Sequence, residues 1–391
     1  MKIVNEAKML IRENIRDYGM FIALFFIMIV FNLLTNGMFM SSRNISNLLD
    51  SAGYIAVLAV GMTLVIVIRH IDLSVGYIAG FLGAVSAILL MQYSLSVFIV
   101  IPIILLLGIL IGFFNGFLIA QLGIPAFVAT LAGMLVFRGA LLQVTAGTGT
   151  IIVQNDFFNA IGNGFIPSFA MINDLHLLTL LIGLVTILFF SYGEIKTRSD
   201  KKKYNFDVVS TGIFLLKMVF LSLIIGYITI ILAGYNGFSW TVIIVLLVTM
   251  IYHFITSKTV LGRQIYAVGS NPEAAHLSGI NVKKVTFMVM GSMSMLAALS
   301  GIMYTSRLQS ATTTAGMLFE LDAIAAAYVG GVSSAGGVGK VTGAIIGAIV
   351  MASLTNGMNL MGVGISYQYM IRGGVLAGAV IFDVMTRKRG K

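Results

Sequence analysis

Residues 96–121 read SVFIVIPIILLLGILIGFFNGFLIAQ and contain no charged side chain. About 20 consecutive apolar residues in a helix are enough to cross the ~30 Å hydrocarbon core of a bilayer. Inside that core every backbone polar group needs an internal hydrogen-bond partner, which an α-helix supplies. This stretch therefore predicts a membrane-spanning helix, and the rest of the chain can be compared with it.

The rest of the chain has the same character. Of 391 residues, 59% are hydrophobic and 10% are charged, with a mean hydropathy of +1.02, whereas soluble domains are about 25% charged. We expect an all-α polytopic membrane bundle of about 10–12 transmembrane helices. The tenth apolar segment is short and ends in Gly330-Gly331, so it is either a half-helix or continuous with the eleventh. The twelve apolar segments are 19–36, 52–69, 75–92, 96–121, 124–143, 176–193, 210–233, 239–256, 286–305, 321–334, 339–357 and 367–386.

Basic residues set the orientation. If the N-terminus is cytoplasmic and successive helices alternate, 19 of the 24 Lys and Arg residues fall in cytoplasmic segments, as the positive-inside rule requires. Both termini are then cytoplasmic. The predicted organisation is a cytoplasmic segment 1–18, a transmembrane domain 19–386 and a basic cytoplasmic tail 387–391. The first apolar run lacks a small-residue cleavage site, so we expect a retained helix and not a signal peptide.

Composition excludes several kinds of site. The chain has no cysteine, so it has neither disulfides nor thiolate metal ligands. Four scattered histidines give no grouping for a metal or an integral membrane enzyme. We expect no cofactor and no metal. The net charge of +10 fits cytoplasmic loops beside membrane lipid better than a nucleic-acid partner.

Two glycine-rich stretches resemble each other. VGYIAGFLGA begins at Val75 and VGKVTGAIIGA begins at Val338, each with small residues at helical spacing. Such spacing lets helix backbones approach closely in lipid. An internal duplication, as in many transporters, is one interpretation; chance similarity between glycine-rich helices is the other.

The longest loop with a distinct pattern is 262–284, GRQIYAVGSNPEAAHLSGINVKK, on the predicted cytoplasmic side. Asn271 suits a helix N-cap, Pro272 the first helical position and Glu273 the positive end of the helix dipole. Gly279 ends the helix within about two turns. Such a helix is either a docking knob or one turn in an ordinary connection.

This loop resembles the cytoplasmic coupling segment of bacterial ABC-type monosaccharide permeases. Other motifs match that family in order, from about residue 40 to 385, and the extra helix pair at 176–233 resembles the xylose and multiple-monosaccharide branch. Region 144–235 itself matches weakly. The matching motifs are Ile71–Gly76, Thr130–Met134 with Phe137–Gly139, Glu320–Ala325, and Gly330-Gly331 through Ala335–Gly339.

The resemblance implies a multi-pass permease subunit of the bacterial cytoplasmic membrane, working as a homodimer. It imports a monosaccharide, with xylose as first candidate, by alternating access. A cytoplasmic ABC ATPase subunit supplies the energy, and an extracytoplasmic sugar-binding protein delivers the substrate. The chain itself is not an enzyme. The implied ATPase-coupling residues are Asn271, Pro272, Glu273, Ala274, Ala275, Ser278 and Gly279.

Nucleotide chemistry is missing from the sequence. A P-loop requires G-x-x-x-x-G-K-[ST], and the nearest stretch, 334–341, has Ser334 at the first glycine and Val341 at the last position. A secondary transporter driven by an ion gradient is the alternative. It would need paired intramembrane carboxylates, and Asp and Glu are nearly absent from the centres of the apolar segments.

Polar groups within the apolar segments are costly in lipid unless they are paired or face water. We expect Asp72, near the cytoplasmic side, and Asp322 to act as helix caps, Lys217 to extend toward an interface, and Arg138 to be paired. Arg372 is a further functional candidate. A path for a neutral sugar needs hydroxyl, amide and aromatic groups, although such groups also bind helices together. The weak pathway candidates are Asn115, Gln143, Asn356, Asn359, Gln368 and Tyr369.

Overall fold

A computed structural model describes residues 15–172, 175–206, 208 and 210–389. Most of the expected N-terminal segment 1–18 and the end of the basic tail 387–391 lie outside these ranges. Within them, nine helices are long and apolar enough to cross a membrane, and α2 and α4 add shorter apolar stretches. The long helices are α2 (Ile15–Leu34), α3 (Ser42–Val67), α4 (Val75–Met91), α5 (Val97–Ala120), α6 (Ala126–Thr145), α8 (Leu177–Lys203), α9 (Thr211–Ala233), α10 (Trp240–Lys258), α13 (Val282–Leu308), α15 (Val341–Leu360) and α16 (Ile365–Arg389).

The prediction of an all-α polytopic bundle is confirmed, and each of the twelve apolar segments contains a helix. The tenth is a separate half-helix, α14 (Phe319–Val329), of 11 residues. The second was placed wrongly at its start, because α3 begins at Ser42 and not near residue 52. The polar stretch before residue 52 continues the same helix, and a hydropathy pattern alone does not include it.

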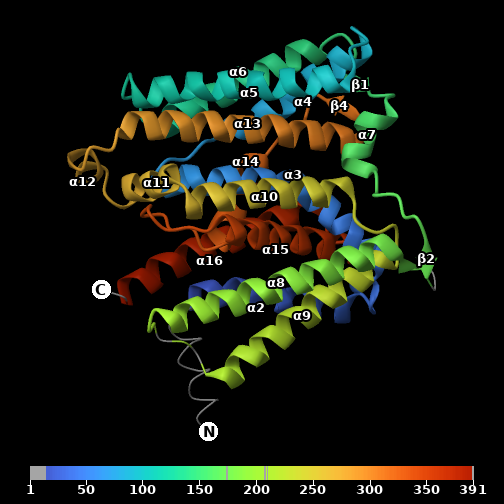
Figure 1. Ribbon diagram of the computed structural model, residues 1–391. Helices are drawn as coiled ribbons and strands as arrows, with labels where there is room; N and C mark the ends of the chain where they lie inside the picture. The colour runs from blue at the N-terminus through green and yellow to red at the C-terminus, as the bar shows by residue number, and fades with distance from the viewer. Residues whose placement is uncertain (1–14, 173–174, 207, 209, 390–391) are drawn as a thin grey trace.

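Short elements join the spans at both ends. Strand β1 (Thr150–Ile152) pairs antiparallel with β4 (Ser310–Thr312), next to α7 (Asp156–Asn163), and β2 (Met171–Ile172) pairs with β3 (Leu175–His176). A single 3-10 turn, η1 (Met38–Met40), precedes α3. At the opposite end lie α11 (Val260–Ser270) and α12 (Pro272–Leu277). The α12 end is also where α2 begins and α16 ends (Figure 1). It is therefore the end that the sequence analysis predicts to face the cytoplasm, and we call it the cytoplasmic end.

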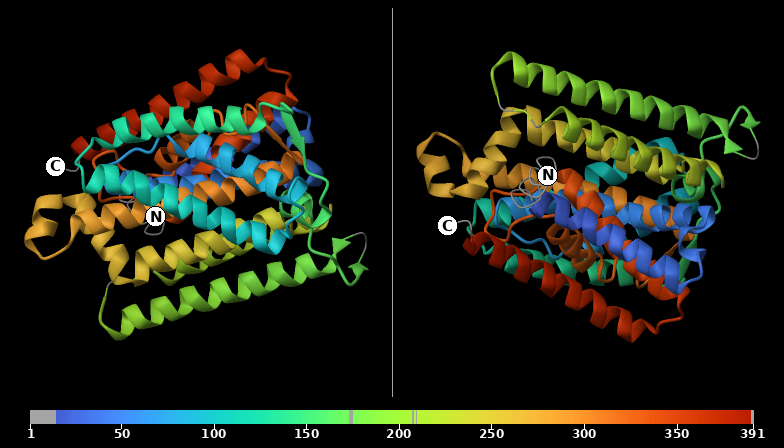
Figure 2. Two further views of the ribbon diagram at one scale, coloured as in Figure 1. Left: turned by 90° about the horizontal axis from the view of Figure 1, so that it is seen from above. Right: turned by 90° about the horizontal axis from the view of Figure 1, so that it is seen from below.

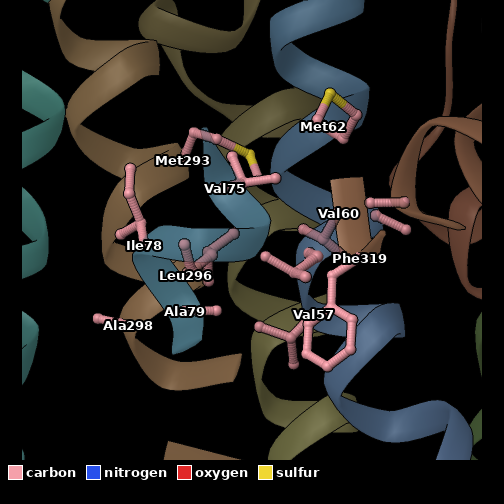
Figure 3. Close-up of a cluster of buried hydrophobic side chains, with 14 of the residues drawn as sticks. Val57, Val60, Met62, Val75, Ile78, Ala79, Met293, Leu296, Ala298 and Phe319 are labelled. Atoms are coloured by element: carbon pink, nitrogen blue, oxygen red, sulfur yellow. The ribbon is translucent and has the colours of Figure 1, made fainter. Parts of the chain in front are cut away.

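The core is built around α3 and α13. In the most apolar window of α3, 89% of the residues are buried, and in that of α13, 72% are buried, against 11% for α8 and for α16. Figure 3 shows how side chains of α3, α4, α13 and α14 meet there: Val57 and Val60 lie near Phe319, and Ile78 lies near Leu296. The hairpin α8–α9 lies at the edge of the bundle (Figure 2).

Glycines allow neighbouring elements to touch through their backbones at two places, one between α4 and the turn before α14 and one between α14 and α15. Gly316 has a φ of +81°, and a methyl group on it would lie 1.9 Å from the carbonyl oxygen of Gly76 in α4. Gly343 and Gly347 of α15 approach the backbone of Gly330 and Ala326 equally closely. The expected role of both glycine-rich stretches in close helix packing is confirmed; whether they descend from one duplicated unit stays a prediction.

We predict that Gly316→Ala destabilises the bundle strongly. Gly362→Ala is the matched control, because Gly362 has a φ of +68° and open space around it. Both variants incur the left-handed backbone penalty of about 1–2 kcal/mol, but only Gly316→Ala adds the collision with Gly76. Thermal unfolding in detergent, followed by size-exclusion chromatography, should show a larger loss for Gly316→Ala. Equal unfolding temperatures would contradict this packing.

Candidate functional site

The short helix α12 forms as the sequence predicts. The Asn271 side-chain oxygen accepts hydrogen bonds from the backbone N–H groups of Glu273 and Ala274, both at 3.1 Å. Pro272 occupies the start of the helix, and Gly279 follows its end with a φ of +84°. The helix therefore keeps its shape through its own caps while protruding from the cytoplasmic end of the bundle (Figure 1).

One face of α12 anchors it and the other is free. Ala275 is buried, while Glu273, Ala274 and Ser278 are exposed. Leu277 is 87% exposed, which is unusual for a leucine at the tip of an ordered helix. The sequence analysis missed Leu277; a lone leucine in an otherwise polar turn was the available signal. An exposed apolar tip beside a carboxylate suits a protein partner.

A set of hydrogen bonds, which we call the Arg69 clamp, holds the end of α11 that leads into α12. Arg69, just past α3, donates from Nε to the carbonyl oxygen of Gly269 at 2.7 Å and from its guanidinium to the carbonyl oxygen of Ser270. The N–H of Gly337 donates to the carbonyl oxygen of Val67 at 2.9 Å. These bonds join α3, α11 and the turn between α14 and α15. The sequence analysis counted Arg69 only as a cytoplasmic charge.

The same turn is held from two further sides. Tyr266 of α11 donates to the carbonyl oxygen of Gly339 at 2.6 Å, and burial raises the pKa of Tyr266, so the phenol stays protonated as a donor. The Asp383 carboxylate of α16 accepts from the N–H and Oγ of Ser334, each at 3.1 Å, and from Oγ of Ser333 at 3.3 Å. The stretch that superficially resembles a P-loop is thus a junction between helices.

We predict that Asn271→Ala loosens α12 without unfolding the bundle. Loss of an N-cap costs about 1 kcal/mol, and a helix of six residues has few other bonds to keep it formed. Hydrogen exchange at the amides of residues 273–277 should accelerate several-fold. Asn281→Ala is the control: Asn281 caps the 27-residue α13 through the N–H of Lys284 at 2.9 Å, so protection within α13 should persist. Unchanged exchange in α12 would show that the cap is not needed.

Deep in the bundle, the N-termini of α4 and α14 meet. A methyl group on Gly76 would lie 2.3 Å from Oε2 of Glu320 and 2.4 Å from the carbonyl oxygen of Gly316. The 11 residues of α14 rise about 16 Å from this point to Gly330 at the cytoplasmic turn, which is about half of the ~30 Å hydrocarbon core. The two helices therefore begin inside the bundle and run toward opposite ends of it.

Two buried carboxylates lie beside this crossing. Asp72 is fully buried, and its expected position near the cytoplasmic side stays a prediction. Its Oδ1 accepts from Ser74 N–H at 2.9 Å and from Ser74 Oγ at 2.5 Å, so it holds the turn before α4, while Ser74 itself occupies the N-cap position. Glu320 is 5% exposed. Carboxylates therefore do lie at the centre of the bundle, and they sit at the positive ends of the two helices, where the dipoles stabilise them.

The other intramembrane charges have partners from neighbouring helices. Asp322, in the first turn of α14, forms an ion pair with Arg372 of α16. The expectation that Asp322 caps the helix was wrong, because Leu318 occupies the N-cap position and no side chain caps α14. Lys217 of α9 pairs with Glu194 of α8 at 2.8 Å; its extension toward an interface stays a prediction. Arg138 of α6 is exposed, and its guanidinium carbon lies 5.9 Å from the ring centre of Tyr77.

Most of the weak pathway candidates make bonds between or within neighbouring elements. Asn115 donates to Ser74 Oγ at 3.2 Å, and Asn356 exchanges hydrogen bonds with Asn44 at 2.8 and 3.0 Å. Gln368 donates to Asn359 at 2.7 Å. Gln143 and Tyr369 are exposed. A role for any of the six in the sugar path stays a prediction. Tyr369 has the surroundings that best suit a sugar, because its ring lies beside Arg372.

The sequence was compared with models of protein families. Residues 44–380 match the family described as branched-chain amino acid transport system / permease component. The chain belongs to this family. It is therefore a transport protein, a multi-pass permease component of the bacterial cytoplasmic membrane.

Its relatives confirm the resemblance to the xylose branch of monosaccharide permeases. The chain is 36% identical over 376 residues to the xylose transport system permease protein of Haemophilus influenzae, covering 96% of this chain and 98% of that one. The Escherichia coli K12 xylose permease is 37% identical, covering 96% and 93%. The ribose import permease of H. influenzae is 34% identical, covering 93% and 91%. No solved structure matches the chain.

Proposed function

We propose that this chain is the membrane-spanning permease subunit of an ABC importer for a monosaccharide, with D-xylose as the first candidate. The observation that carries the proposal is the self-capped helix α12, which presents Glu273 and the 87% exposed Leu277 at the cytoplasmic end. The two xylose permease relatives, similar over nearly the whole chain, support the choice of substrate.

The partner at α12 is a cytoplasmic ABC ATPase subunit, and ATP hydrolysis takes place there and not in this chain. Leu277 fits an apolar pocket of the ATPase, and Glu273 fits a basic or hydrogen-bonding rim. The exposed residues of the predicted coupling set, together with Leu277, form this contact. Asn271, Pro272, Ala275 and Gly279 shape the helix from behind. On the opposite side of the membrane, an extracytoplasmic sugar-binding protein delivers the substrate.

Two copies of the chain form the working unit. Arg138 on α6 and the Asp322–Arg372 pair between α14 and α16 are partly exposed at membrane depth. Charged groups are expensive against lipid, whereas exposed leucines and phenylalanines are not. In Figure 2 α6 and α16 lie on the same side of the bundle, so this side faces the second copy and the path between the copies, while lipid covers the other sides.

Alternating access follows from how α12 is attached. Closure of the ATPase pair on nucleotide binding moves α12, and the Arg69 clamp passes that displacement to the end of α3 and to the turn before α15. The segment after Arg69 leads directly to the α4 N-terminus at the mid-membrane crossing. A rigid-body shift at the cytoplasmic end can thereby change the packing of the two half-helices at the centre.

We predict that Leu277→Asp and Glu273→Arg each weaken association with the ATPase subunit. A new charge at the tip must be desolvated in the interface, and the reversed charge opposes the rim, so association should fall at least about tenfold. Co-purification in mild detergent measures it. Tyr204→Asp is the control, because Tyr204 is 68% exposed at the end of α8, outside α12. An intact complex in both α12 variants would contradict the docking role.

We predict that Arg69→Lys separates ATP hydrolysis from transport. Lysine keeps the charge but cannot reach two carbonyl oxygens with a fixed planar fork. The complex should assemble and hydrolyse ATP, while sugar taken up per ATP falls several-fold in proteoliposomes. Lys340→Arg, a charge-conserving change at the adjacent turn, should leave that ratio near the unmodified value. A normal ratio in Arg69→Lys would show that the clamp is only structural.

The alternative function is an ion-coupled secondary sugar transporter. Asp72 and Glu320, buried together at the crossing, are the observation in its favour. Ser74 donates to Oδ1 of Asp72, and the two helix N-termini favour negative charge, whereas Asp72 Oδ2 and Glu320 Oε2 are buried without a hydrogen-bond partner among the described residues. Uptake by this chain alone in vesicles without ATP, driven by an ion gradient, would establish the alternative. Uptake that requires the ATPase and ATP would exclude it.

A further inference from the structure

An ion pair and an aromatic ring lie together at membrane depth, on the side of the bundle that α14 and α16 form. Asp322 and Arg372 are bound to each other, with 21% and 19% of their side-chain surface exposed. The guanidinium carbon of Arg372 lies 5.9 Å from the ring centre of Tyr369, which is 43% exposed. Arg372 is seven residues into α16, about 10 Å from its outer end, and Asp322 is in the mid-membrane turn of α14.

Further aromatic side chains gather behind this pair. Tyr54 of α3 packs against Tyr304 of α13 at 5.1 Å between ring centres and against Phe319 of α14 at 4.9 Å. Phe319 stands one helical turn before Asp322 on α14. Four helices thus bring an acceptor, a donor and several aromatic rings to one part of the bundle.

This set of groups has the chemistry that a monosaccharide requires. A guanidinium donates to adjacent hydroxyl oxygens in a planar fork, and a carboxylate accepts from hydroxyl hydrogens. An aromatic face packs against the C–H face of a sugar ring. The pair is neutral as a whole, so it does not attract ions. Partial exposure also suits passage, because a transport site must hold its substrate weakly enough to release it.

We propose that Asp322, Arg372 and Tyr369 form a sugar-contacting station in the transport path. The station rests on the proposed function, since it needs a sugar path beside α14 and α16. Substrate hydroxyls bind Arg372 and Asp322 while the sugar ring lies against Tyr369. Asp322 and Arg372 remain bound to each other when the path is empty, which keeps both charges paired at membrane depth.

A single cysteine tests the location, since the natural chain has none. In the assembled complex in proteoliposomes, Tyr369→Cys should react with a charged, membrane-impermeant methanethiosulfonate, and D-xylose should slow that reaction several-fold. Leu188→Cys on α8, at a 60% exposed position of the peripheral hairpin, is the control and should react slowly with or without sugar. Equal rates at the two positions, or no protection by D-xylose, would overturn the station.

Asp322→Asn tests the chemistry with little change in shape. Loss of a hydrogen bond to a charged group should lower D-xylose uptake at subsaturating sugar by about tenfold. It should also change the ratio of uptake between D-xylose and its deoxy analogues, which a merely structural ion pair would not alter. Glu194→Gln removes the ion pair with Lys217 and should change neither quantity. An unchanged ratio in Asp322→Asn would assign the pair to helix packing.

The outcomes also separate this inference from the proposed function. If the unmodified complex takes up D-xylose with ATP and the α12 variants lose the ATPase, the permease function stands whatever the cysteine shows. If the unmodified complex transports no monosaccharide, the proposed function fails and the station fails with it.

Discussion

The structure depends on the backbone contact between the N-terminal turn of α4 and the turn that precedes α14. Gly76 and Gly316 approach so closely that neither position has room for a side chain. Because both helices begin at this contact, their free N–H groups and positive dipole ends lie deep in the bundle. Asp72 and Glu320 place carboxyl oxygens, which are hydrogen-bond acceptors, beside these helix ends. A helix end at membrane depth is tolerated only where protein surrounds it, which explains why α3 and α13 bury this region so completely.

In the proposed mechanism, the same contact lets the two ends of the molecule communicate. α4 runs from the crossing toward the outer side, and the 11-residue α14 runs from it to the cytoplasmic turn, so both helices begin inside the bundle. At the cytoplasmic end the Arg69 clamp joins α3, α11 and that turn. A shift of α12 therefore reaches structure that ends at the centre of the bundle. If two continuous helices occupied these positions, the same shift would move each helix as a whole, and the contact between helix ends at the centre of the bundle would not exist to open.

The sequence predicted the helices well and their packing poorly. Apolar length is a local property, so the apolar helices and the short tenth segment could be derived from it, while the orientation that lysine and arginine indicate stays a prediction. The cap at Asn271 and the stop at Gly279 are also local, and both formed as expected. The early start of α3 and the burial of Asp72 could not be derived, because they depend on which helices pack together. Lys217 shows the same limit: its partner Glu194 lies 23 residues earlier on another helix.

The candidate functional residues show the same difference between local properties and properties that depend on packing. The short exposed helix α12 could be predicted because its caps and its polar composition are local, while the coupling role of its residues stays a proposal. The roles of Asn356 and Gln368 could not be assigned from sequence. A single amide side chain in an apolar helix gives the same sequence pattern whether it lines a transport path or bonds to another amide. In the structure both have amide partners, and their polar groups are satisfied without substrate. The Asp322–Arg372 pair differs because it stays partly exposed at a depth where lipid is the usual neighbour. Such a pair needs water, substrate or a second protein surface beside it, and this requirement is the physical basis for proposing that the sugar passes along the α14–α16 side of the bundle.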